Sequence, residues 1–348
     1  MKKIKIAIIF GGHSSEYGVS LQSAYSVISH LNEEKYEKIL MGITKQGEWY
    51  RFYGSPEKIR SDQWMGTECV PAILSPSREV HGIIEFAENG IKQTYVDVAF
   101  PILHGKYGED GTVQGLIELA GIPLVGCDTL SSALCMDKQK SHKLVDMVGI
   151  KTAKSLVFDH TFNEVDLVKN VRKLQYPLFV KPLRAGSSFG ITKVFEEVSL
   201  MEAVRRAYEY DSQIIVEEEI DGFEVGCAVL GNQRLIVGEV DEIELENGFF
   251  DFTEKYTLKS SKIHMPARLP MDLAIRIKQM AVKIYEALGC RGFARVDMFL
   301  TEEGEIVFNE VNTIPGFTSH SRYPNMLKGI GYSFENIIDE LVRLAMEE

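Results

Sequence analysis

Several features that would assign a chain to a class at once are absent from these 348 residues. No window is long and apolar enough to span a membrane. The apolar run at residues 6–10 meets Gly11 directly, so it is too short for a signal peptide and fits a buried strand. The formal net charge is −12, without a basic cluster. We therefore expect a cytoplasmic protein that binds neither nucleic acid nor a membrane.

Cysteine pairs at metal-binding or redox spacing are also missing. The sequence has five cysteines, an odd number, and no C-x-x-C pair. Scattered thiols are typical of reduced cytoplasmic proteins and not of disulfide scaffolds or zinc sites. They are Cys69, Cys127, Cys135, Cys227 and Cys290.

Strand-length apolar runs alternate with helix-spaced segments in the first part of the chain. Residues 4–10, 37–44 and 96–103 fit strands, and residues 19–31 and 111–120 fit helices. This alternation predicts an α/β domain with an open parallel sheet. The length of the whole chain and the strands expected later in it predict two further domains. The expected domains span residues 1–125, 126–219 and 220–348.

Two Gly-rich segments are candidates for anion binding. The turn at residues 11–16 lacks the spacing of a dinucleotide site, and taken alone Glu16 is better explained by a favourable interaction with a helix dipole. The second segment follows a strand that ends in Lys181 and continues as PLRAGSSFG. A lysine followed by Gly and Ser donors favours phosphate binding over a plain surface loop.

Acidic and amide side chains alternate with apolar ones in two C-terminal segments. Asp297 lies between two apolar residues, and Glu310 and Asn312 flank Val311. On neighbouring strands the period of two would put all three on one face. Two carboxylates and an amide suit Mg²⁺ shared with nucleotide phosphates. A solvated sheet face is the alternative, which the apolar neighbours disfavour.

Two further segments are ambiguous by themselves. The acidic stretch at 216–220, with Glu224 soon after, could bind adenine and ribose, but a charged turn explains it almost as well. The segment FDFTEKY at 250–256 follows an Asn-Gly turn. Taken alone, it is better explained as a surface loop.

Eight segments, in order along nearly the whole chain, resemble the D-alanine–D-alanine ligase family of the ATP-grasp superfamily. They are FGGHSSEYGVSL, LHGKYGEDGTVQG, GCDTLSSALCMDK, KPLRAGSSFGITKV, EEEIDGFEV, DFTEKY, RVDMF and NEVNTIPGFTSHSRYPNM. The resemblance implies an α/β, three-domain ATP-grasp architecture: an N-terminal domain for the first D-alanine, a central ATP-grasp subdomain, and a C-terminal subdomain for the metal and second substrate. It also implies ATP and Mg²⁺ (or Mn²⁺) as cofactors, a role in peptidoglycan synthesis, and a homodimer.

The resemblance assigns roles to individual residues. Glu16 would hold the ammonium of the first D-alanine, and Ser187 would link it to Tyr256. Arg295 and the N–H of Gly316 would stabilise the oxyanion. Further substrate-binding residues would be His104, Glu109, Lys255, Ser321 and Arg322. ATP would be bound by Lys138, Lys181, Glu217, Glu218 and Glu224, and the metal by Asp297, Glu310 and Asn312.

Two positions refine the subfamily. Arg322 stands where housekeeping enzymes usually carry leucine. At this position the sequence resembles the vancomycin-resistance ligases. Lys255-Tyr256 is retained, whereas the D-lactate-forming ligases replace that stretch. Together they resemble a D-alanine–D-serine ligase, with a housekeeping D-alanine–D-alanine ligase as the alternative. A dehydrogenase, disfavoured by the missing G-x-G-x-x-G motif, and a non-catalytic ATP-binding module are the readings outside the family.

Overall fold

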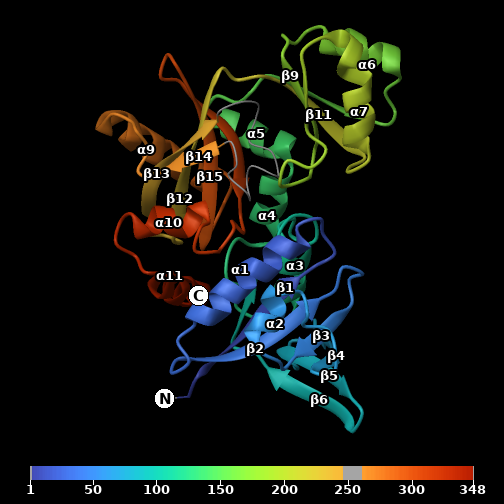
Figure 1. Ribbon diagram of the computed structural model, residues 1–348, viewed down its shortest axis with the longest axis vertical. Helices are drawn as coiled ribbons and strands as arrows, with labels where there is room; N and C mark the ends of the chain where they lie inside the picture. The colour runs from blue at the N-terminus through green and yellow to red at the C-terminus, as the bar shows by residue number, and fades with distance from the viewer. Residues whose placement is uncertain (1, 246–260, 348) are drawn as a thin grey trace.

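A computed structural model describes residues 2–245 and 261–347, which form three sheets (Figure 1). Lys255 and Tyr256 lie outside the described residues. No helix within these two ranges is long and apolar enough to cross a membrane.

The N-terminal sheet has the strand order β6-β5-β4-β3-β2-β1-β7. The predicted parallel pairing covers β2, β1 and β7, and β3 to β6 join antiparallel. Only residues 44–48 separate β2 from β3, too few for the crossover that a parallel pair needs. The strands are β1 (Ile4–Gly11), β2 (Tyr36–Ile43), β3 (Trp49–Phe52), β4 (Cys69–Leu74), β5 (Gly82–Ala87), β6 (Gly90–Tyr95) and β7 (Val98–Pro101).

Helix α1 (Tyr17–His30) packs on this sheet because its buried residues recur at helical spacing, as in Leu21, Ala24 and Val27. It begins directly after Glu16, which places that carboxylate where the first strand ends. The other helices here are α2 (Pro56–Arg60) and α3 (Thr112–Leu119).

The central sheet has the order β10-β9-β11-β8 and lies within the predicted second domain. Its strands are β8 (Ser155–Asp159), β9 (Leu178–Pro182), β10 (Thr192–Val194) and β11 (Gln213–Glu218). The accompanying helices are α4 (Thr129–Met136), α5 (Lys138–Met147), α6 (Glu164–Val171), the 3-10 turn η1 (Glu197–Ser199) and α7 (Leu200–Tyr208). In Figure 1, α6 and α7 lie against this sheet, and α4 connects it with the N-terminal part.

The C-terminal sheet is antiparallel, in the order β14-β13-β12-β15-β16. Its strands are β12 (Gly222–Leu230), β13 (Ile236–Leu245), β14 (Ser261–His264), β15 (Phe293–Thr301) and β16 (Ile306–Asn312). The helices are α9 (Met271–Ala287), α10 (Arg322–Lys328) and α11 (Phe334–Ala345). Both α9 and α10 contact β12 and β13.

One hydrophobic core joins the N-terminal and C-terminal sheets. The ring of Phe100 on β7 packs 6.3 Å from that of Phe293 on β15 and 6.2 Å from that of Phe317. All three are buried, and edge-on aromatic pairs add about 0.5–1.5 kcal/mol each beyond their burial. The segment after β16 is therefore anchored against the N-terminal sheet. The predicted boundaries at 125 and 219 stay predictions.

Candidate functional site

The five side chains predicted to bind ATP line one cavity of about 480 Å³. Strands β9, β11 and β12 contribute four of them, and Lys138 begins α5. The cavity also reaches Glu310 on β16. Its size is within the usual range for a small-molecule site. The fold thus brings Lys138, Lys181, Glu217, Glu218 and Glu224 together, and their role in ATP binding stays a prediction.

Charges inside this cavity are arranged in a buried cluster. Lys181 Nζ donates to Glu217 Oε2 at 2.5 Å, and Lys138 Nζ donates to the carbonyl of Ala185 at 2.8 Å. Burial alone would raise the pKa of Glu217, but the charges of Lys181 and His142 hold it below its usual value. Glu217 Oε1 and His142 Nδ1 lie 3.8 Å apart and are buried, and neither makes a hydrogen bond within the described chain. Such orphaned atoms fit a polar ligand in the cavity.

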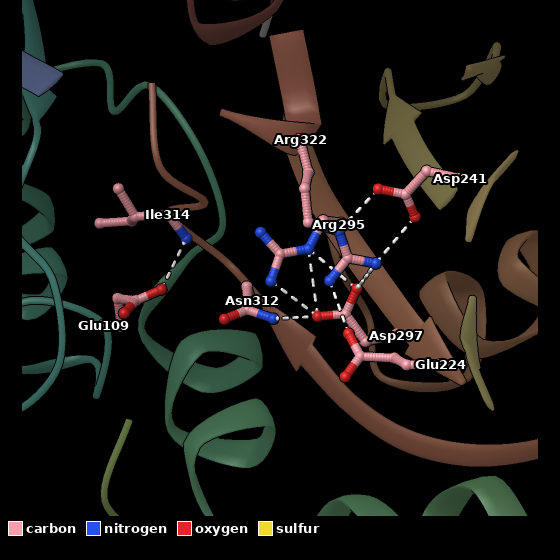
Figure 2. Close-up of polar contacts among 8 residues, drawn as sticks. All are labelled: Glu109, Glu224, Asp241, Arg295, Asp297, Asn312, Ile314 and Arg322. Atoms are coloured by element: carbon pink, nitrogen blue, oxygen red, sulfur yellow. Dashed lines mark hydrogen bonds and ion pairs between the residues drawn. The ribbon is translucent and has the colours of Figure 1, made fainter. Parts of the chain in front are cut away.

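The predicted metal ligands lie side by side on β15 and β16. Asp297 pairs with Glu310 across the two strands, and Arg295 pairs with Asn312. Asp297 Oδ2 accepts from Asn312 Nδ2 at 2.8 Å and from Arg295 Nη2 at 2.7 Å (Figure 2). The expected one-face arrangement of these strands is confirmed.

The donor set fits Mg²⁺ held together with phosphates. No cluster of three His, Cys, Asp or Glu side chains in the described ranges is arranged to bind a metal. Mg²⁺, however, is usually held by one or two carboxylates plus substrate phosphates. Asp297, Glu310 and the amide of Asn312 supply that set next to the cavity that Glu310 lines.

Arg322, at the start of α10, lies among carboxylates (Figure 2). Its Nε and Nη2 donate to Asp241 at 2.6 and 2.8 Å, its Nη1 donates to Glu224 at 2.5 Å, and Nη2 lies 3.4 Å from Asp297 Oδ1. Arg322 is 7% exposed and Asp241 0% exposed. The guanidinium therefore joins the segment predicted to bind the second substrate to the predicted ATP and metal ligands.

Sequence reasoning missed Asp241. It lies on β13, where acidic residues at 239, 241, 242 and 244 do not alternate cleanly with apolar ones. No face could therefore be assigned to it. The only available signal was that a buried arginine requires a carboxylate partner.

On the N-terminal side, Ser187 Oγ donates to Glu16 Oε1, as the predicted Glu16–Ser187 link requires. The approach is close: a Cβ at Gly105 would lie 2.2 Å from Glu16 Oε2, and at Gly186 2.8 Å. A side chain at either position would therefore displace the Glu16 carboxylate, and the φ of +71° at Gly105 also favours glycine. The third predicted member, Tyr256, lies outside the described residues.

His104 and Glu109 contact the segment that carries Gly316. Glu109 accepts the N–H groups of Gly105 at 2.8 Å and Ile314 at 3.0 Å, and His104 Nδ1 lies 2.8 Å from the carbonyl oxygen of Ile314. Burial and the charge of Glu16 raise the pKa of Glu109. Burial lowers the pKa of His104 to about 4. These side chains thus bind backbone near Gly316.

Ser321, the remaining residue predicted to bind the second substrate, lies in the same segment as Gly316. Its Oγ accepts the N–H of Thr318 at 2.9 Å, and a Cβ at Gly316 would lie 3.0 Å from that oxygen. Ser321 and Gly316 are therefore neighbours. Their contacts with substrate stay predictions.

We expect buried His104 to make the fold less stable in mild acid. The unfolded chain takes up a proton near pH 6.5, whereas folded His104 takes it up only near 4. Stability contributed above pH 6.5 is therefore lost as the pH falls toward 4. His104→Gln cannot titrate, so its unfolding free energy, measured in urea, should fall less steeply over this window, by up to about 1.4 kcal/mol per pH unit. If the unfolding free energies of both proteins fall equally steeply with pH, the lowered pKa of His104 is contradicted.

Comparison with known proteins agrees with this geometry. The family models "D-ala D-ala ligase N-terminus" and "D-ala D-ala ligase C-terminus" match residues 5–127 and 144–343. The fold and site define an ATP-grasp enzyme of the ligase class. The chain belongs to the D-alanine–D-alanine ligase family.

Its relatives include both resistance and housekeeping enzymes. The chain is similar to the vancomycin B-type resistance protein VanB of Enterococcus faecalis, with 46% identity over 100% of both chains. It is 42% identical to a D-alanine–D-alanine ligase of Caldicellulosiruptor bescii, over 100% of this chain and 96% of that one. The structure is similar to the VanG D-Ala:D-Ser ligase from Enterococcus faecalis, with a TM-score of 0.92 and 58% identity over 99% and 100% of the chains.

Proposed function

We propose that this protein is an ATP- and Mg²⁺-dependent ligase that joins D-alanine to D-serine through D-alanyl phosphate. Family membership supports the ligase class, and the similarity to a D-Ala:D-Ser ligase at 58% identity supports the second substrate. The observation that carries the D-serine proposal is the buried Arg322–Asp241 pair beside Ser321.

The first half of the reaction requires two anions to approach each other. Lys138 and Lys181 would hold the ATP phosphates, and Glu16 would hold the ammonium of D-alanine. Bound Mg²⁺ would supply the positive charge that offsets the phosphates. Ser187, through its bond to Glu16, would close the loop at 184–190 over the acyl phosphate and exclude water.

The second half requires stabilisation of an oxyanion. Arg295 Nε and Nη2 donate to Asp297, which fixes the plane of the guanidinium, and Nη1 is the nitrogen we assign to substrate. The N–H of Gly316 would be the second donor. Donors fixed before the reaction stabilise the developing charge without reorganising.

The choice of D-serine follows from polarity at the second site. Arg322 and the neighbouring Ser321 are the polar residues that we assign to this site. A hydroxymethyl group there would gain a hydrogen bond from the buried polar network. D-alanine cannot make that hydrogen bond, so D-serine should gain about 0.5–1.5 kcal/mol at this site.

Direct competition tests the proposal. With equal D-alanine and D-serine, ATP and Mg²⁺ at neutral pH, we expect mainly D-alanyl-D-serine, identified by mass spectrometry. L-serine and D-lactate serve as controls and should give little product. Mainly D-alanyl-D-alanine would contradict the D-serine assignment and favour the housekeeping alternative. If ATP binds but no D-alanine-dependent ADP release occurs, a non-catalytic ATP-binding module would be favoured instead.

We propose further that the enzyme works in the cytoplasm as a homodimer on peptidoglycan precursors. The relatives named as vancomycin-resistance proteins support a role in resistance. Static light scattering would test the dimer.

A further inference from the structure

The segment that carries Gly316 follows β16 but is held by residues from the N-terminal sheet. Both backbone polar groups of Ile314 are bound: its N–H donates to Glu109, and its carbonyl oxygen contacts His104. Phe317 N–H donates to Ser23 Oγ at 3.2 Å, and Ser23 lies on α1. Gly316 therefore lies between two backbone points fixed by the N-terminal part.

Ser23 and His104 are also bonded to each other, with His104 Nε2 3.2 Å from Ser23 Oγ. Because burial lowers the pKa of His104 to about 4, the ring is neutral at neutral pH and carries one proton. The carbonyl of Ile314 can only accept, so that proton is on Nδ1. Nε2 then accepts, and the Ser23 hydroxyl must donate to it.

Each of these three hydrogen bonds therefore has a defined donor and acceptor. Phe317 N–H donates to Ser23, Ser23 donates to His104, and His104 donates to Ile314. Ser23 is 0% exposed, Phe317 2% and His104 4%. Water cannot easily replace the hydroxyl, and its loss would leave both Phe317 N–H and His104 Nε2 unpaired.

We infer that Ser23 is a positioning residue for the ligase reaction: it fixes the N–H of Gly316 where the oxyanion develops. This inference rests on the proposed function. The aromatic contacts of Phe317 with Phe100 and Phe293 hold its ring, but only the polar contacts fix the backbone. Oxyanion donors act within about 2.7–3.1 Å, and a shift of about 1 Å can cost roughly 100-fold in rate.

Ser23→Ala tests this role because it removes one oxygen without adding volume. We expect kcat for dipeptide formation to fall about 10- to 100-fold while the KM for ATP changes less than about twofold. Binding of a phosphinate dipeptide analogue, which mimics the tetrahedral oxyanion, should weaken in parallel with kcat. A merely structural role would not produce this split.

Ser132→Ala is the matched control. Ser132 lies on α4, is also 0% exposed, and its hydroxyl donates to the carbonyl of Cys127, away from the Gly316 segment. We expect its kcat and its KM values to stay within about twofold of wild type. Its melting temperature should fall by about as much as that of Ser23→Ala.

The outcomes separate the two proposals. Wild-type protein that forms no D-alanyl dipeptide would overturn the proposed function and this inference with it. An active wild type beside Ser23→Ala of unchanged kcat would overturn the inference alone. If Ser23→Ala does not fold, Ser23→Cys, which keeps a weak donor, should show a smaller fall in kcat with the same KM for ATP. Unchanged kcat in that variant would equally overturn it.

Discussion

Glu310→Gln is expected to lower D-alanine-dependent ATP turnover at least about 100-fold with little change in stability. The substitution keeps the shape of the side chain and removes its charge. Glu310 is one of the residues predicted to hold Mg²⁺, and it pairs with Asp297 across β15 and β16. Losing one of the two predicted carboxylate ligands should weaken Mg²⁺ binding, because Mg²⁺ prefers charged oxygen ligands.

The measurement is ADP release at increasing Mg²⁺, with melting temperature recorded alongside. Glu305→Gln is the control, since Glu305 precedes the same strand and pairs with Lys151 at the surface. Excess Mg²⁺ should restore part of the activity of Glu310→Gln and leave Glu305→Gln unaffected. Turnover near that of wild type in Glu310→Gln would remove the metal assignment.

Arg322→Leu should destabilise the fold by about 3–5 kcal/mol, because it leaves Asp241 buried without its cation. Asp241 is fully buried and takes both of its hydrogen bonds with Arg322 from one guanidinium edge. The measurement is the unfolding free energy in urea, with product ratios determined on the same samples. Those ratios should move from D-alanyl-D-serine toward D-alanyl-D-alanine.

Removing both partners should recover much of this loss. In the double variant Asp241→Leu/Arg322→Leu no buried charge of the pair remains, so the two changes should be strongly non-additive. Arg172→Leu is the matched control: Arg172 forms a two-bond pair with Glu197 at the surface, so its loss should change the unfolding free energy little. Additive losses at 241 and 322 would show that the pair is not coupled.

The parts of the site that sequence alone predicts are those encoded locally. The alternation around Asp297 and Glu310 identifies two strands, and residues 302–305 are a connection short enough to make them neighbours. The Lys181 segment is similarly local. In the N-terminal sheet, by contrast, short strands such as β3 and β6 have no apolar run that separates them from loops.

Apart from the Glu16–Ser187 contact, which the family resemblance implied, contacts between distant residues were out of reach. Asp241 and Arg322 are 81 positions apart, and Ser23 and Phe317 are 294 apart. A serine in a helix with apolar neighbours is an ordinary residue until the fold supplies its partner. Which side chain it meets depends on how the sheets pack, and a single sequence does not state that.

The shared core has a consequence for synthesis on the ribosome. Residues of β1 and α1 share one hydrophobic cluster with Ile337, Leu341 and Val342 of α11, so the earliest-made apolar surface meets its partners roughly 300 residues later. At about 5–20 residues per second this interval is on the order of tens of seconds. During that time the part of this cluster that packs on α11 stays exposed on the nascent chain, which favours recognition by a ribosome-associated chaperone.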